Sequence, residues 1–219
     1  QKDKFKNHYF LVWKGCQRGI MEIIKEFIVK EVIRPGNVLY VNDNITYQFK
    51  SMEFIHNDWH MYPSCIVGHE DFKLDIIKDY LIDPIKYRLD PKANTEKVCI
   101  IKSSGSTNLT SSGIVSEHQI KSFCKKHNLY WIEPGSTHEL YVINALYNCK
   151  VFVTSWGTAF FKNNVYLSDK CTDIYVLIIG SAFKGQFNSG NNNPTRCKNA
   201  KIHYILCNNN EITMPMQMV

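Results

Sequence analysis

The sequence lacks several patterns that would place it in a well-known class at once. No run of 18 or more apolar residues occurs among its 219 residues, which excludes a membrane-spanning helix in this chain. Its eight cysteines form no C-x-x-C pair, which argues against a zinc ribbon and thioredoxin-like redox chemistry. The motifs G-x-G-x-x-G and G-x-x-x-x-G-K-[ST] are also absent, so neither a common dinucleotide site nor a P-loop is expected.

The net charge is positive but small. Lys and Arg number 26 against 20 Asp and Glu, which gives +6 at pH 7. The basic residues are mostly scattered lysines, without an Arg-rich block or a basic-aromatic cluster, so no nucleic-acid partner is expected. The charge fits a small anionic ligand, and it equally fits an ordinary solvated lysine surface.

The cysteines give weak information on the compartment. Cys99 lies in an apolar run and Cys124 on the apolar face of a helical pattern, where buried free thiols are expected. Scattered cysteines favour a reducing compartment, so the cytoplasm is favoured over the Golgi lumen. The abundance of Asn, Lys and Ile indicates an AT-rich genome, such as that of a protist or a large virus.

What the chain does contain is an alternation of short apolar runs with helical patterns. The runs expected to be strands are 98–101, 129–132, 151–154, 174–179 and 201–206. Helical patterns lie between them at 116–127 and 136–149. This alternation predicts an α/β fold with a parallel sheet.

The first part of the chain predicts a helix followed by a strand at 37–41. Pro35-Gly36 is expected to stop this helix. The apolar residues that recur at helical spacing are Ile20, Ile23, Ile24, Phe27 and Ile28. Residues 71–90 are expected to form a polar helix and a connecting arm, and the boundary between two lobes, 1–90 and 91–219, is placed near 89–96.

Two helix starts match the capping box, in which a Ser side chain and a Glu or Gln three residues later satisfy each other's backbone N–H groups. Ser116 pairs with Gln119 in this pattern, and Ser136 pairs with Glu139. Both helices are therefore expected to begin at these serines.

Polar turns follow the predicted strands of the second half. Residues 102–108 and 155–158 come directly after strands, while Glu117 and Glu139 open the helices. Every strand-to-helix loop of a parallel sheet emerges on the same side, so these residues are expected on one rim. Ordinary turns selected for glycine and capping chemistry would give the same pattern.

Four blocks within residues 60–178 resemble glycosyltransferase family 61 and the related capsular-polysaccharide transferases, in the same order. The first is His60 to Gly68, similar to a His-Cys-Phe-Pro-x-x-x-Val-Gly block. The second is Val98 to Lys102, with Asn108 and Glu117. The third is Ser136 to Glu139, and the fourth is Ser155 to Phe160, which falls where the family has His-Gly-Ala-Gly-Leu.

This resemblance implies a GT-B-like architecture, with two Rossmann-like lobes of parallel sheets and a cleft between them. Residues 1–90 would form the acceptor-side lobe and 91–219 the nucleotide-sugar lobe. It implies inverting hexosyl or pentosyl transfer from a nucleotide sugar, usually a uridine diphosphate sugar, to a glycan or glycoprotein acceptor. Metal independence is typical of the family, and the chain has no Asp-x-Asp; no metal or other cofactor is expected.

The same resemblance implies the donor-binding residues. They are Lys102, Ser103, Asn108, Glu117, Glu139, Ser155, Trp156, Gly157 and Thr158. Without a metal ion, basic side chains and helix N-termini must stabilise the charge on the leaving phosphate. Lys102 and the N–H groups of Gly157 and Thr158 are the candidates for this role.

The chain departs from the family pattern at three places. The paired arginines of the first basic turn are here at best Lys102 and Ser106, and a lysine cannot make an arginine's bidentate phosphate contact. Trp156 replaces a His, and its ring could stack on a base or pack in the core. The Asp expected after Asn7 and His8 is missing, because Lys14 or Gly15 falls there.

Inverting transfer also needs a general base near the acceptor hydroxyl. The candidates in the first lobe are His8, His56, Asp58 and His60. His56-x-Asp58-x-His60 would put three polar groups on one strand face, which also fits a metal site or a plain surface strand. Glu117 and Glu139 are weaker candidates for the general base, because capping or the dipole at a helix start already explains an acidic residue at both positions.

A second hypothesis follows from the departures. The missing arginine pair and the missing Asp also fit a catalytically inactive sugar- or nucleotide-binding relative.

Overall fold

The core of the molecule is a five-stranded parallel sheet. The computed structural model describes residues 8–13, 18–42, 44–48, 77–87, 95–103, 115–179, 200–207 and 212. The strands lie in the order β4-β3-β5-β6-β7, and every neighbouring pair is parallel. Their bounds are β3 (Lys97–Ile100), β4 (Tyr130–Trp131), β5 (Val151–Ser155), β6 (Asp173–Ile178) and β7 (Lys201–Leu206). The predicted α/β fold with a parallel sheet is confirmed.

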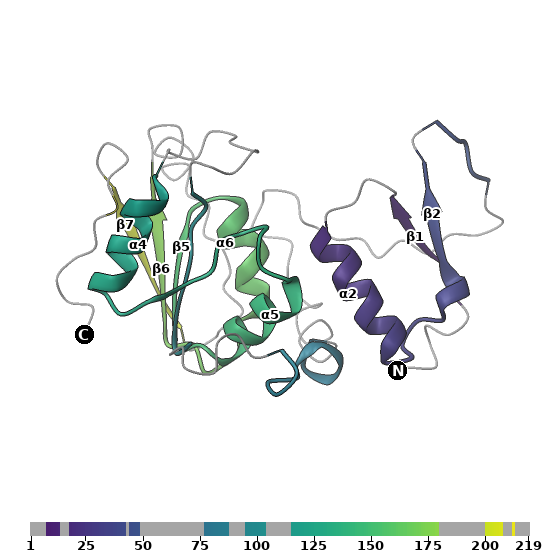
Figure 1. The fold of residues 1–219 in the computed structure, drawn as a ribbon, viewed down its shortest axis with the longest axis horizontal. Coiled ribbons are helices and arrows are strands. Elements are labelled where there is room, and N and C mark those ends of the chain that lie inside the picture. The colour runs from purple at the N-terminus through teal and green to yellow at the C-terminus, as the bar shows by residue number, and fades with distance from the viewer. Residues whose placement is uncertain are drawn as a thin grey trace.

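Helices cover both faces of this sheet (Figure 1). Helix α4 (Glu117–Lys126) connects β3 to β4, and α5 (Glu139–Asn148) leads back past β3 to β5. The short α6 (Thr158–Asn163) and the 3₁₀ turn η4 (Asn164–Tyr166) then lead on to β6. The crossover from β3 to β4 and the crossover from β4 to β5 run in opposite directions across the sheet. Because such crossovers are right-handed, they place α4 and α5 on opposite faces. The sheet is therefore doubly wound.

The core confirms this two-sided arrangement, because successive strand residues enter different clusters. Val98 and Ile100 pack with α5 and α6, whereas Cys99 and Ile101 pack with α4. All four side chains are at most 1% exposed. A fully buried side chain of this size contributes about 1.5–3 kcal/mol, so the two apolar layers account for much of the fold's stability. Cys99 and Cys124 are buried free thiols in the α4 layer, as predicted.

A second, two-stranded sheet lies in the first part of the chain. Strand β1 (Phe10–Trp13), α2 (Arg18–Val29) and β2 (Val38–Val41) form a βαβ unit, in which Phe10 pairs with Val38 and Trp13 with Val41. A 3₁₀ turn, η1 (Pro35–Asn37), precedes β2. The strand β1 was not predicted, whereas β2 begins within one residue of the expected strand.

Helix α2 differs from its prediction in two ways. It ends at Val29 rather than at Pro35, because Glu31 adopts a left-handed conformation (φ 56°) and Val32 N donates back to Phe27 O (2.8 Å). That bond belongs to a Schellman-type helix end. The inward face also differs in part: Ile23 and Phe27 pack against the main core as predicted, but the buried residues are Glu22 and Glu26, and Ile20 is 47% exposed.

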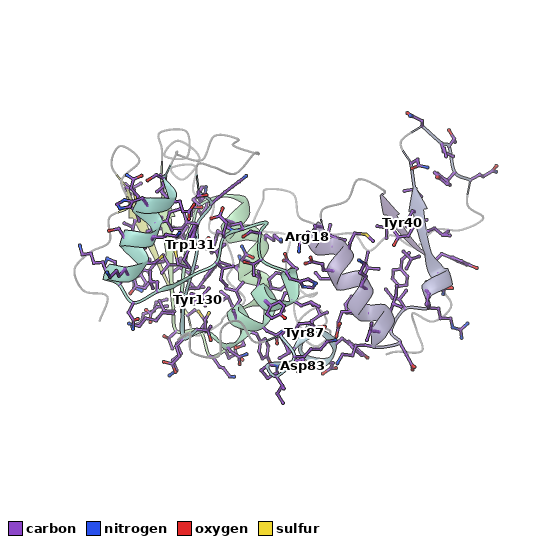
Figure 2. All side chains as sticks on the ribbon, viewed as in Figure 1. Arg18, Tyr40, Asp83, Tyr87, Tyr130 and Trp131 are labelled. Atoms are coloured by element: carbon purple, nitrogen blue, oxygen red, sulfur yellow. The ribbon has the colours of Figure 1, made fainter. Side chains whose placement is uncertain are left out.

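The segment 77–87 joins α2 to the main sheet. It begins with a π-helical turn, η3 (Ile77–Leu81), and not with a long polar helix in its described part. Asp83 N donates to Asn144 Oδ1 of α5 (2.8 Å), and Lys86 Nζ and the Tyr87 hydroxyl both contact the Glu26 carboxylate of α2. Figure 2 shows Asp83 and Tyr87 close to α5 and α2. The segment thus links the two helices through polar contacts that are buried or partly buried.

One predicted capping box is confirmed and the other is wrong. Ser116 Oγ accepts from Gln119 N (3.2 Å), and the Gln119 side chain accepts from Ser116 N (2.9 Å). Helix α5 instead begins at Glu139 with His138 as its N-cap. Ser136 lies in the preceding turn, where its hydroxyl donates to Glu133 O. The ring nitrogen Nδ1 of His138 therefore caps α5, which is the role that the sequence pattern assigned to Ser136.

In the part of the chain that the structure describes, no helix is long and apolar enough to cross a membrane. The block His60 to Gly68 and residues 89–94 of the lobe boundary expected near 89–96 lie outside the described residues. Only two parallel strands are described in the first 90 residues, so the two-lobe division stays a prediction.

Candidate functional site

The strand order creates one position with the geometry of a ligand site. The connection after β3 leads to β4 on one side, and the connection after β5 leads to β6 on the other. Strands β3 and β5 are neighbours, with Ile100 beside Thr154, so the two loops leave the same edge in opposite directions. Open α/β sheets bind ligands at such a switch point, beyond the carboxyl ends of the strands.

The β3 side of this switch point carries Lys102 and Ser103. Ser103 is buried, and its N and Oγ both donate to Glu133 Oε1, over 3.4 and 3.2 Å. Glu133 follows β4, the neighbour of β3 on the other side. Its second oxygen, Oε2, is buried and has no hydrogen-bond partner among the described residues. Burial raises the pKa of Glu133, and the charge of Glu117 adds to this, while the Ser103 bonds and Lys102 oppose it.

The β5 side carries Ser155, Trp156 and Gly157. Ser155 is buried at the end of the strand, and Gly157 has φ 107° and ψ −151°, a region that side-chain-bearing residues rarely adopt. The Trp156 ring is 5% exposed, stacks on Phe160 (centroids 6.0 Å apart) and meets Tyr204 edge-on. The ring packs in the core, and its predicted contact with the donor stays a prediction. Thr158 begins α6.

Glu117 and Glu139 both open helices on the same edge, but they are held differently. Glu117 is exposed and pairs with Lys121 one turn later in α4. Glu139 is buried, and its Oε2 lies 2.8 Å from Lys162 Nζ of α6. Its Oε1 is buried and has no hydrogen-bond partner within the described ranges. Glu139 thus faces the junction of α5 with α6 and α2.

At that junction a second group of polar side chains meets, which the sequence patterns did not single out. The carboxylate of Glu22 on α2 accepts from Arg18 Nε (2.7 Å) and from Glu139 N (2.6 Å), and lies 3.4 Å from His138 Nδ1. Burial alone would raise the pKa of Glu22, but the bond from Glu139 N, together with Arg18 and His138, lowers it. Glu22 is therefore held as a charged group.

The remaining predicted residues are not brought to this edge by any recorded contact. His8 lies at the amino end of β1, where its carbonyl oxygen accepts from Asn37 Nδ2 (3.0 Å). Asp58, His60 and Asn108 fall outside the described residues. Over the described ranges, no group of three His, Cys, Asp or Glu side chains is arranged to hold a metal ion.

The residues that sequence reasoning missed had only faint signals. Glu133 is an acid placed just after a short strand and before Pro134-Gly135, a position that could have been flagged from strand order. Arg18 and Glu22 have the i, i+4 spacing of an ion pair. Nothing local in the sequence pairs Glu22 with Glu139, because 117 residues separate them.

Comparison with models of known protein families gives no match, and a search of curated proteins also finds none. The family resemblance of the sequence blocks therefore stays a prediction.

Proposed function

We propose that the chain is a nucleotide-sugar-dependent glycosyltransferase, which transfers a sugar with inversion and without a metal ion to a glycan or glycoprotein. The observation that carries the proposal is the switch point between β3 and β5, flanked by Lys102–Ser103 and Ser155–Gly157. Phosphate-bearing ligands are the usual occupants of this position in doubly wound sheets. Among phosphate-bearing ligands, the four sequence blocks similar to glycosyltransferase family 61 favour a nucleotide sugar, and a uridine diphosphate sugar in particular.

The residues at the edge suit parts of such a donor. Lys102 supplies positive charge after β3. The Ser155 hydroxyl at the end of β5 can donate a hydrogen bond, and the Ser103 hydroxyl, which donates to Glu133, can still accept one. Glu133, at the end of the strand beside β3, stands where Rossmann-type sheets place an acid that binds a ribose hydroxyl. The general base remains to be chosen among His8, Asp58 and His60. The GT-B arrangement of two lobes belongs to this proposal.

The second candidate is a sugar- or nucleotide-binding relative without transferase activity. The burial of Trp156 favours it, because the position where the family has His then offers no side-chain donor to a phosphate. The lack of an arginine at positions 102 and 106, which are Lys102 and Ser106 here, also favours an inactive relative.

A panel of nucleotide sugars in a thermal-unfolding assay tests the proposal. A ligand at about 100 times its dissociation constant stabilises a fold by about 2.7 kcal/mol, which is easily measured. We expect at least one uridine, guanosine or cytidine sugar to raise the melting temperature and to be slowly hydrolysed. If none of them shifts it, both candidates fail. Binding without hydrolysis or transfer to any acceptor would favour the inactive relative.

Two lysine variants sharpen the assay. Lys102→Ala removes the cation at the switch point, and Lys121→Ala removes an exposed lysine on α4 that pairs with Glu117. We expect only Lys102→Ala to weaken donor binding. Equal binding by both variants would remove Lys102 from the donor site.

A further inference from the structure

Three nitrogen-bearing side chains meet two carboxylates where α2, α5 and α6 come together. Arg18 Nε lies 2.7 Å from Glu22 Oε1, Lys162 Nζ lies 2.8 Å from Glu139 Oε2, and His138 Nδ1 lies 3.4 Å from Glu22 Oε2. The side chains of both glutamates are 8% exposed, whereas those of Arg18, Lys162 and His138 are 66%, 40% and 37% exposed. The carboxylates therefore form the buried side of the cluster, and the donors form its outer side.

The helices approach closely enough to make this one cluster. Glu139 N donates to Glu22 Oε2 over 2.6 Å. A Cβ atom added to Gly19 would lie 2.6 Å from Glu139 Oε2, the same oxygen that Lys162 contacts. Arg18 and Lys162 thus flank a single contact between α2 and α5, which has no room for a methyl group. Figure 2 shows Arg18 at the end of α2 that lies beside α5 and α6.

Each of the three side chains keeps donors that its carboxylate does not use. Arginine has five N–H donors, and only Nε of Arg18 is engaged by Glu22; lysine has three. Leu140 N donates to His138 Nδ1 (3.3 Å), so in the neutral ring the proton must reside on Nε2. No contact of the Arg18 terminal nitrogens or of His138 Nε2 is recorded within the described ranges. The outer side of the cluster consequently offers donors alone.

We propose that Arg18, His138 and Lys162 bind the diphosphate group of the nucleotide donor. An arginine fork fits two phosphate oxygens at once, and a lysine adds a point charge. The cluster would supply the arginine contact that Lys102 and Ser106 cannot make. Its position fits, because His138 lies at the N-terminus of α5, on the same sheet edge as the switch point, and Lys162 lies about one turn into α6, which begins at that edge. This inference rests on the proposed function for the identity of the ligand.

The proposal gives the two buried glutamates a positioning role. Glu22 fixes the Arg18 guanidinium through Nε, and Glu139 fixes the Lys162 ammonium. The charge on Glu22 is in turn offset by the N–H of Glu139 at the positive end of α5. Side chains that are held in this way lose little conformational freedom when an anion binds.

Calorimetric titration with uridine diphosphate, inorganic diphosphate and uridine tests the site. We expect Arg18→Ala to weaken binding of uridine diphosphate and of inorganic diphosphate by about tenfold or more, since hydrogen bonds to charged groups are among the strong ones. Uridine has no phosphate, so its affinity should not change. His138→Asn retains a good N-cap for α5 but lacks the outer N–H, and it should weaken the same two ligands.

Lys86→Ala is the matched control, because Lys86 also pairs with a buried glutamate of α2, Glu26, but at the other end of the helix. It should leave all three affinities unchanged. Arg18→Lys retains the charge and loses the fork, so an intermediate loss is expected. Circular dichroism of each variant confirms folding, and Arg18→Lys serves if Arg18→Ala does not fold.

The outcomes separate the two proposals. Uridine diphosphate binding that is equal in wild type, Arg18→Ala and Arg18→Lys overturns the phosphate site and leaves the proposed function standing. Arg18-dependent binding of inorganic diphosphate without binding of any nucleotide supports the anion site and overturns the proposed function. If neither uridine diphosphate nor inorganic diphosphate binds the wild-type protein, the phosphate site is wrong, and the proposed function also fails if no guanosine or cytidine sugar binds.

Discussion

Glu22 Oε2 accepts a hydrogen bond from the backbone N of Glu139 over 2.6 Å. A side chain of α2 therefore caps α5, a helix of the main sheet that lies 117 residues away in sequence. The free N–H groups at a helix start favour a negative charge, and here the protein supplies it from another helix. The βαβ unit of the first residues is thus tied to the edge of the sheet where the ligand is proposed to bind.

The first prediction concerns the pH dependence of this contact. The pKa of Glu22 is lowered in the folded state, so the contact stabilises the fold above the ordinary glutamate pKa, about 4.3, and its contribution is lost as the pH falls through the lowered value. Glu22→Gln should be less stable by roughly 1–3 kcal/mol at pH 7. Urea unfolding of both proteins from pH 7 to pH 3 should show this difference shrinking. A constant difference would contradict the prediction.

The second prediction concerns Gly19. Alanine is favoured over glycine in a helix by about 1 kcal/mol, but here the new methyl group would meet Glu139 Oε2 at 2.6 Å. We expect Gly19→Ala to cost about 1–2 kcal/mol net, since overpacking outweighs the gain in helix propensity. In a Glu139→Ala background, Gly19→Ala should stabilise the protein. Gly36→Ala serves as a control, because a Cβ atom added to Gly36 would have no other atom within 4 Å. Additive effects in the double-mutant cycle would refute the contact.

The third prediction compares the two serines that share the capping pattern. Ser116→Ala should destabilise the protein by about 1 kcal/mol, because the hydroxyl accepts from Gln119 N. Ser136→Ala should have a smaller effect, because Ser136 only donates to the Glu133 carbonyl in a turn. Denaturant midpoints of the two variants measure this directly, and an equal loss at both serines would show that Ser136 also caps a helix.

The main sheet could be predicted because its central strands, β3, β5 and β6, are short apolar runs buried on both faces. The pattern is clear at Val98–Ile101 and in β6, where alternate residues fill the two layers. Helix α6 was missed because six residues are too few to show a helical period. Local propensity could not place the end of α2, since Glu31 adopts a conformation that is uncommon for a residue with a side chain.

The candidate site was predictable only in part. Lys102, Ser103 and Ser155 follow strands, so the rule for parallel sheets places them on one edge. The burial of Trp156 was an open alternative, because an indole suits both a core and a ligand. Glu22 was missed because the apolar pattern indicated that isoleucines would form the inward face of α2. Glu22 can be buried there because Glu139 N of α5 donates a hydrogen bond to its carboxylate. Such a bond depends on tertiary contact.

The fourth prediction follows from the Trp156 packing. Trp156→Ala should destabilise the protein by about 3–5 kcal/mol, the usual cost of deleting a large buried aromatic side chain. Trp156→Phe retains a ring against Phe160 and Tyr204 and should cost less. Urea unfolding gives both values. If Trp156→Ala unfolds like the wild type while donor binding weakens, the ring serves the ligand and not the core.

The most direct test of the central claim is a titration of the labelled protein with a uridine diphosphate sugar, followed by the backbone amide resonances. A donor bound at the switch point should cause saturable shifts that are largest at Ser103, Glu133, Ser155 and Gly157, where the loops after β3, β4 and β5 meet. Smaller shifts are expected at the start of α5. The absence of saturable shifts at these amides, or shifts confined to β1 and β2, would contradict a donor site at the switch point.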